Sequence, residues 1–226
     1  MDVREHFNSY LEIIHPTKSR DFIRRELKKD EELKKELKKR SLQDSLFNVI
    51  FAAAIAFIFS MLATPLIIPA DQLNLTGQTE GISAFVKLVS SPAFITLRFL
   101  FGIPLFYAFQ YVLYLMLKVI GGNPEYPSQV YLVSILRIPA IIFPILIALT
   151  VNVIPQIGIL FDLIRFLSIV IGIYIIFLFY SVIKESNASL SWYLTLIVMI
   201  VYLALELLLE PIISILVIGL FLSIFM

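Results

Sequence analysis

Five charged residues interrupt the long apolar stretches of this 226-residue chain, where a charge needs a partner or a functional reason. Counted at about 1.5 Å per residue from the outer ends of the expected membrane spans, they lie at one level near the outer leaflet. They could form a polar vestibule for a substrate or an ion. The alternative, more frequent for such residues, is snorkelling at helix ends with structural ion pairs. The five are Arg98, Asp162, Arg165, Glu206 and Glu210.

Arg137 stands apart from these residues, roughly 13 Å from the cytoplasmic end of the expected third span. At that depth it cannot reach the outer carboxylates. Gln110 lies at the matching depth of the second span, and Tyr107, Tyr111 and Tyr114 share its helical face at spacings of three and four. We therefore expect a structural tie from Arg137 to Gln110 and these tyrosines, in preference to a transport or catalytic role.

The residue types needed for common enzyme chemistry are scarce. The two histidines, His6 and His15, are nine residues apart, which is not a helical metal-ligand spacing, and the chain has no cysteine. No metalloprotease motif, nucleophile elbow or phosphate-binding glycine loop occurs. We expect no catalytic residue, no metal and no cofactor. With a formal net charge of +1 there is also no basic excess for nucleic acid.

The elements that carry these residues are expected to be membrane helices. Hydrophobic residues make up 59% of the chain and the mean hydropathy is +0.92. Apolar runs of about 18 to 25 residues match the ~30 Å hydrocarbon layer. The sequence thus predicts an all-α, polytopic helical membrane bundle with five spans, at 47–69, 93–118, 129–151, 157–183 and 190–210. The apolar tail 212–226 is either a half span returning from Pro211 or a short sixth crossing.

Residues 1–46 are expected to form a short helical head on the 47–226 bundle. They hold twelve of the 18 lysines and arginines. Residues 3–14 form an amphipathic pattern whose apolar side includes Phe7, Leu11 and Ile14. This helix either lies in the membrane interface or packs on the bundle. A second, Lys/Glu-rich helix over 19–40 is expected to be solvated, near anionic head groups, or else to dock a partner.

The distribution of basic residues predicts the orientation. The basic head belongs in the cytoplasm, and alternating crossings then place Lys118 and Lys184 at cytoplasmic ends. Loop 70–92 is outside in this topology, and loops 119–128 and 184–190 are inside. Asn74 and Asn187 begin glycosylation sequons, both weak signals, and the second lies on the wrong side. We expect an integral protein of the cell membrane.

The layout resembles the YIP domain family, whose name denotes Ypt-interacting membrane proteins. The likeness rests on His15, Pro16 and the following Phe22, on the 41–46 lead into an alanine-rich first span, and on two later features, the Gly121–Gly122 turn and Pro139 in the third span. The resemblance implies a five-span bundle with a cytoplasmic N-terminus, and in eukaryotic members scaffolding of small GTPases. A Lys/Glu-rich, cysteine-free chain favours a prokaryotic, archaeal member.

Two functions follow as expectations. The first is a scaffold that binds lipid or a membrane or cytoplasmic protein and performs no catalysis. The second is a small transporter or channel that uses the outer charged residues and the third span, where Pro139 and Pro144 interrupt the helix and expose carbonyls. The bilayer is the expected partner in both.

Overall fold

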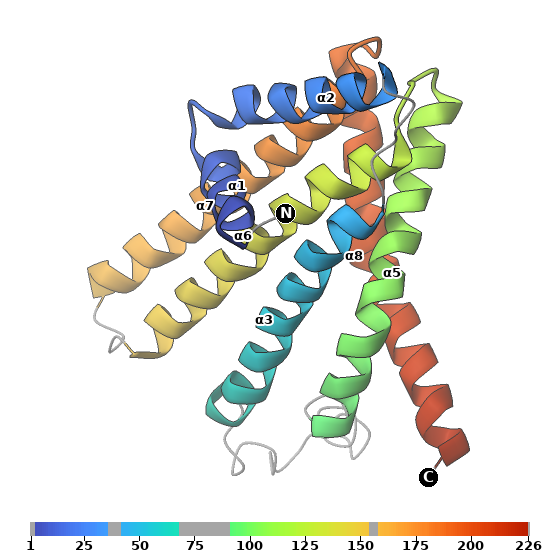
Figure 1. The fold of residues 1–226 in the computed structure, drawn as a ribbon. Coiled ribbons are helices and arrows are strands. Elements are labelled where there is room, and N and C mark those ends of the chain that lie inside the picture. Colours follow the sequence, from blue (N-terminus) through green and yellow to red (C-terminus); the bar gives the residue numbers. More distant parts are fainter. Residues whose placement is uncertain (1–2, 36–41, 68–90, 154–157, 226) are drawn as a thin grey trace.

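The structure is a computed structural model that describes residues 3–35, 42–67, 91–153 and 158–225 (Figure 1). Its regular elements are all α-helices within these ranges, which confirms the all-α fold class. Two short helices form the head, and five longer helices form the bundle. They are α1 (Val3–Ile14), α2 (Ser19–Lys35), α3 (Gln43–Ile67), α5 (Pro92–Val119), α6 (Tyr126–Val153), α7 (Gly158–Ser186) and α8 (Trp192–Phe225).

Four helices of the described chain have segments long and apolar enough to cross a membrane. These segments are Pro92–Val119, Tyr126–Phe143, Asp162–Ser186 and Trp192–Leu220. The expected first span corresponds to α3, whose apolar stretch, Ser45–Met61, is shorter. An integral membrane protein is therefore supported by four spans, and the fifth span stays a prediction.

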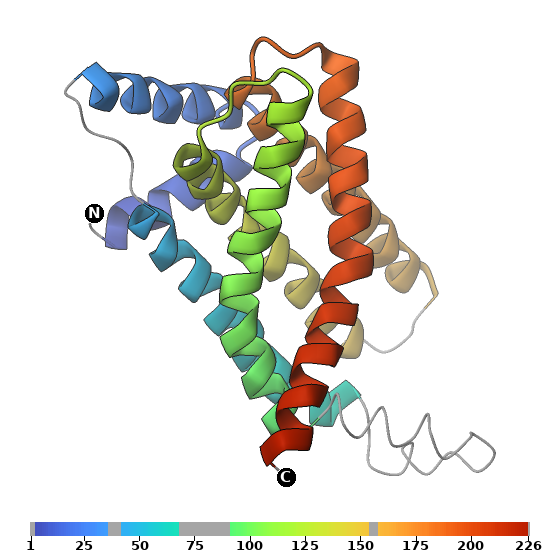
Figure 2. The same cartoon turned by 90° about the vertical axis from the view of Figure 1, so that its right-hand side faces the viewer.

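The tail at 212–226 is not a separate crossing and does not turn back at Pro211. Helix α8 continues through Pro211 in one direction and ends at Phe225 (Figures 1 and 2). At 34 residues it is about 51 Å long, well beyond the ~30 Å of a hydrocarbon layer. Proline is tolerated inside membrane helices because neighbouring groups can satisfy the carbonyl that it frees. Both alternatives for this tail are therefore wrong.

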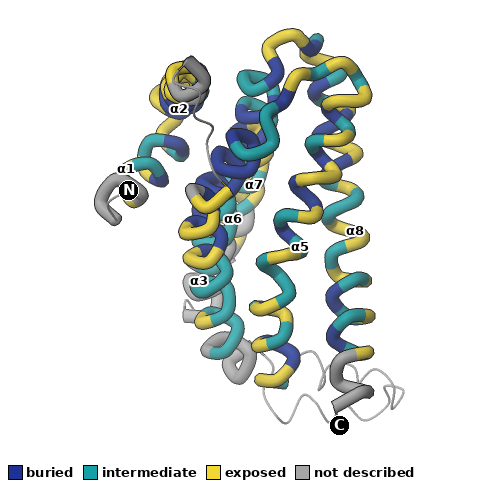
Figure 3. Tube along the Cα trace, turned by 45° about the vertical axis from the view of Figure 1, so that its right-hand side comes forward, coloured by how far each residue is buried: buried dark blue, intermediate teal, exposed yellow. Residues whose placement is uncertain are grey.

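The bundle buries its residues mainly where the helices meet the head. Helix α3 packs between α5 and α6, α7 lies along α6, and α8 packs on α5 and α7. Buried positions are dense on α6 and sparse along the outer faces of α7 and α8 (Figure 3). Ile173, Phe177 and Leu208 are among the exposed apolar side chains on those faces. Exposed apolar helix faces of this size are expected of a surface that contacts lipid.

A glycine turn joins α5 to α6. Gly121 has a φ of 88°, a left-handed conformation that side-chain-bearing residues rarely adopt. At Gly122 a Cβ would lie 2.8 Å from the Leu117 carbonyl oxygen and 2.9 Å from Oδ1 of Asn187. The turn was expected from the sequence and explains Gly121, and close packing against the α7–α8 connection, which was not expected, explains Gly122.

The head lies at the same end of the bundle as the α5–α6 and α7–α8 connections (Figure 1). Arg20 and Arg24 of α2 donate to the Glu185 carboxylate at the end of α7, with N–O distances of 2.7 and 2.9 Å. Phe22 and Ile23 of the same helix are buried. This arrangement fits the prediction that the head and both connections share one side of the membrane. The expected outer loop, 70–92, lies almost wholly outside the described residues.

Helix α1 both packs on the bundle and exposes apolar side chains. The Tyr10 hydroxyl donates to Oδ1 of Asn48 at 2.7 Å, and Ile13 is fully buried. Phe7 and Leu11 are 60% and 50% exposed. Packing of this helix on the bundle is therefore confirmed, while its position in the membrane interface stays a prediction.

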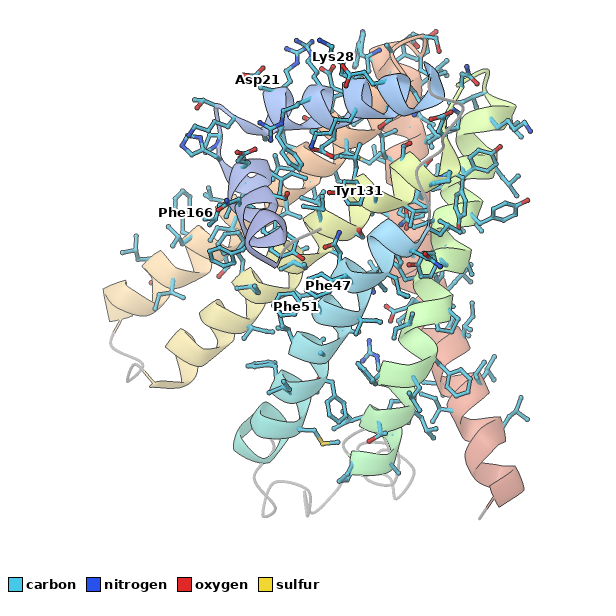
Figure 4. All side chains as sticks on the ribbon, viewed as in Figure 1. Asp21, Lys28, Phe47, Phe51, Tyr131 and Phe166 are labelled. Carbon is cyan, nitrogen blue, oxygen red and sulfur yellow. The ribbon has the colours of Figure 1, made fainter. Side chains whose placement is uncertain are left out.

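Ile14 does not lie on the exposed side of α1 with Phe7 and Leu11, where the sequence predicts it. It packs against the core and is partly buried, and its carbonyl accepts a hydrogen bond from the Tyr174 hydroxyl of α7 at 2.9 Å. In Figure 4, Phe47 and Phe51 of α3 lie to one side of α1, and Phe166 of α7 lies to the other. All three rings are exposed. The exposed face of α1 thus adjoins an apolar surface of the bundle.

Candidate functional site

Among the expected outer residues whose side chains the structure describes, only Arg98 and Glu210 are paired with each other. Arg98 of α5 donates from Nη2 to Oε1 of Glu210 on α8, at 3.3 Å. Asp162 is exposed near the start of α7 and forms no ion pair with Arg98 or Arg137. The side chain of Arg165 lies outside the described residues. The expected single cluster is wrong because the ends of α7 and α8 diverge (Figures 1 and 2).

Arg137 has a carboxylate partner, contrary to the prediction. Its Nη1 lies 3.9 Å from Oε1 of Glu206 on α8, and its guanidinium stacks over the Phe106 ring, 4.7 Å from the centroid. The prediction is wrong because it takes residue 210 as the outer end of a span, whereas α8 continues to Phe225. Measured from the starts of their helices, Glu206 lies about 21 Å along α8 from Trp192 and Arg137 about 17 Å along α6 from Tyr126, so the two side chains can meet.

Gln110 binds α8 and not Arg137. Its Nε2 donates to the Tyr202 hydroxyl at 2.8 Å, and its backbone oxygen accepts from Nε2 of Gln129 at 3.3 Å. Tyr202 lies one helical turn before Glu206. Gln110 and Arg137 therefore contact the same face of α8, at Tyr202 and Glu206, and are not hydrogen-bonded to each other. The side-chain oxygen of Gln110 is buried and has no hydrogen-bond partner in the described part of the chain.

The three tyrosines of α5 meet Tyr126 at the start of α6. The rings of Tyr111 and Tyr114 each lie 5.6 Å from the Tyr126 ring, and the Tyr126 hydroxyl donates to the backbone oxygen of Tyr107 at 2.9 Å. The expected contact with Arg137 is wrong because the four positions from 107 to 114 spread over about 100° of the helix. That arc is wide enough to direct the tyrosines and Gln110 to different neighbours.

A cavity of about 540 Å³ lies between α3, α5, α6 and α8. We call it the arginine cavity, because both Arg98 and Arg137 line it. Glu210 also lines it, together with the hydroxyls of Ser60 and Ser214. The rest of the wall is apolar, with aromatic side chains from α3 and α5 and small residues between them. These apolar residues are Val49, Ala53, Ala56, Phe57, Phe94, Ile95, Phe99, Gly102, Ile141, Pro211 and Ile215.

A second cavity, of about 270 Å³, lies between α5, α6, α7 and α8. Its polar wall consists of Gln110, Tyr202, Glu206 and Arg137. Arg137 therefore lines both cavities, and its contact with Glu206 lies where the two approach each other. A guanidinium in this position can bind an anion from either side, and its five N–H donors favour oxyanions.

Comparison with known proteins adds no assignment. No protein-family model matches this chain. No curated protein and no solved structure is similar to it either. The resemblance to the YIP domain family, and the roles that it implies, therefore stay predictions.

The described residues contain no group of three or more histidine, aspartate or glutamate side chains that could hold a metal ion. His15 contacts the backbone N–H and hydroxyl of Thr17 through Nδ1, at 3.4 and 3.2 Å, which explains it as part of the turn between α1 and α2. The polar groups suited to ligand binding are thus the arginines and carboxylates of the two cavities.

Proposed function

We propose that this chain is an integral membrane protein that acts by binding and not by catalysis, with the arginine cavity as its binding site. The observation that carries the proposal is that the hydrogen-bond donors of Arg137 are unused in the described part of the chain. Its guanidinium lines a cavity inside the bundle, yet it donates no hydrogen bond to any residue that the structure describes. An intramembrane charge with unused donors is a strong candidate for ligand binding.

The surrounding groups support a binding role. Phe106 stacks on the guanidinium and limits its rotation, while Glu206 at 3.9 Å compensates its charge without using its donors. Arg137 is thereby oriented before any ligand arrives. Such preorganisation lowers the entropic cost of binding.

We also propose a location in the cell membrane with the N-terminus in the cytoplasm. Lys118 and Lys184 lie at the same end of the bundle as the exposed bases of α2, including Lys28. Clustered bases at one end favour the cytoplasmic side. If α3 also crosses the bilayer, the chain has the five spans of the YIP-like layout, and the head offers a charged surface for lipid or for a scaffolded protein.

The test is mass spectrometry of what co-purifies with the full chain from native membranes in a mild non-ionic detergent. We expect a bound lipid or small molecule that the wild type retains and Arg137→Gln loses. Lys28→Gln is the matched control, because it removes one positive charge from an exposed site outside both cavities. A wild type without any retained species, or identical retention in Arg137→Gln, would refute the proposal.

A small transporter is the second candidate, favoured by the position of Arg137 on the walls of both cavities. A ligand bound by Arg137 could pass from one cavity to the other if its contact with Glu206 opened. Reconstitution into proteoliposomes separates the two functions. A gradient-dependent flux that Glu206→Gln abolishes would assign transport, and its absence across a broad panel of ions and metabolites would favour binding alone.

A further inference from the structure

We infer that the arginine cavity binds an amphiphile carrying a singly charged oxyanion, with the oxyanion on Arg137 and the apolar body against α3 and α5. This inference rests on the proposed binding function and names the ligand class of the same site. The shared chemistry is a monoanionic oxygen group, either the carboxylate of a single-chain lipid or the phosphodiester of a phospholipid.

The charges of the wall indicate an anion. Two guanidiniums, Arg98 and Arg137, and one carboxylate, Glu210, line the cavity, whereas the Glu206 carboxylate that compensates Arg137 lines the second cavity. A cationic ligand in the arginine cavity would therefore meet more guanidiniums than carboxylates. A doubly charged anion would add more unbalanced charge than a monoanion, in a medium where such charge is strongly unfavourable.

The two arginines differ in whether their hydrogen-bond donors are already used. Arg98 already donates to Glu210, whereas Arg137 donates to no described residue. The carboxylate of Glu206 lies on the wall of the second cavity, at a distance beyond hydrogen bonding. The planar guanidinium fork of Arg137 therefore remains open to two oxygens of one ligand, the geometry that carboxylates and phosphates share.

The remaining wall suits an apolar body. Small residues, Ala53 and Ala56 of α3 and Gly102 of α5, line the cavity, and a Cβ built at Gly102 would meet no atom within 4 Å. The rings of Phe57 and Phe99, 5.3 Å apart, close the apolar part of the wall. About 540 Å³ is within the ~300 to 1,000 Å³ of sites that hold small organic ligands.

The test measures binding of palmitate and of palmityl alcohol to the full chain in dodecyl maltoside. Palmitate should bind at least about tenfold more tightly, equivalent to ~1.4 kcal/mol, because the alcohol lacks the charge. Dioleoylphosphatidylglycerol and dioleoylglycerol, which lacks the phosphodiester, form a second pair that distinguishes a phosphodiester source from a fatty-acid source. A preference for the anionic member of either pair supports the inference, and equal binding within both pairs overturns it.

Two variants locate the ligand. Gly102→Leu should fill the cavity and reduce palmitate binding about tenfold or more. The fold should persist in this variant, because leucine is a better helix former than glycine. Gly172→Leu on α7 is the matched control, because a Cβ there also meets no atom within 4 Å and Gly172 lines neither cavity. Arg137→Gln should remove the preference for palmitate over the alcohol.

The outcomes distinguish this inference from the function on which it rests. If Gly102→Leu and Arg137→Gln remove a co-purifying species that neither palmitate nor phosphatidylglycerol displaces, the ligand class is wrong and the binding function stands. If neither substitution changes what co-purifies, the binding function itself is refuted. Equal loss of palmitate binding in Gly172→Leu and Gly102→Leu would place the ligand outside the cavity and also overturn the inference.

Discussion

Arg137 and Glu206 face each other from α6 and α8 with 3.9 Å between Nη1 and Oε1, and their side chains are 31% and 29% exposed. Arg137 lies about 17 Å along α6 from Tyr126, and Glu206 about 21 Å along α8 from Trp192. Each residue therefore stabilises the charged form of the other, and removing either one leaves an uncompensated charge inside the bundle.

Glu206→Gln should destabilise the protein by about 1 to 3 kcal/mol, since it leaves Arg137 charged and without its carboxylate. Thermal unfolding of the purified protein in detergent would show a lower Tm. The double variant Arg137→Gln, Glu206→Gln should recover most of that loss, because no charge then remains unpaired. Fully additive losses in the double variant would mean that the two residues do not interact.

Tyr10→Phe should loosen the attachment of the head to the bundle. It removes the donor to Oδ1 of Asn48, a buried acceptor, at a cost of about 1 to 2 kcal/mol. Limited proteolysis of the full chain should then cleave between α1 and α3 faster than in the wild type. Tyr193→Phe, at an exposed position of α8, is the control and should leave the cleavage rate unchanged.

The same contact predicts a dependence on alkaline pH. Burial raises the pKa of Tyr10 to about 12, from an ordinary value of about 10. The folded state therefore holds the phenol proton more tightly, and the stabilisation is present below pH 10 and is lost as the pH rises through about 12. Proteolysis of the head should accelerate over this range in the wild type. A Tyr10→Phe protein with the same pH profile would contradict this cause.

Leu11 should lie in the apolar part of the membrane interface. A spin label on a cysteine introduced at Leu11 should be more accessible to oxygen than to a water-soluble nickel complex, because Leu11 is an apolar side chain that is half exposed on the amphipathic helix α1. A label at Lys28 of α2 should show the reverse order. A water-accessible label at Leu11 would show that α1 does not lie in the membrane interface.

The connections after α5 and α7 should be accessible from one side. Single cysteines at Asn123 and Ser189, both exposed, should react with an impermeant reagent in the same vesicle orientation. A cysteine at Thr79, in the expected outer loop, should react in the opposite orientation. Labelling of Asn123 and Ser189 from different sides would contradict the arrangement of α5 to α8.

The sequence located the helices well, because a run of apolar residues is enough to define a membrane helix. The expected span 93–118 differs from α5, Pro92–Val119, by one residue at each end. The run does not define which side of the helix faces which neighbour, since lipid and protein interior both accept apolar side chains. The contacts of Tyr126 and Tyr202, which the sequence does not predict, depend on how each helix is rotated about its own axis.

The predicted depth of Glu206 is wrong because it depends on a span that ends at Pro211. Such a span would place Glu206 near the outer end and away from Arg137, but α8 continues past Pro211. Glu206 and Glu210 are four residues apart and lie on one face of α8, which the sequence does indicate. The pairing of each with its own arginine required the relative heights of α5, α6 and α8, which only the folded structure provides.

Pro211 has no amide hydrogen, so the Leu207 carbonyl of α8 lacks the donor that an ordinary helical residue would supply. A helix bends most easily where a backbone hydrogen bond is missing, so Pro211 is the position at which α8 is expected to bend. Pro211, Ser214 and Ile215 line the arginine cavity, while Glu210, just before this position, is paired with Arg98. A bend at Pro211 would change the width of the cavity, and membranes of different thickness, which tilt long helices differently, would favour different bends.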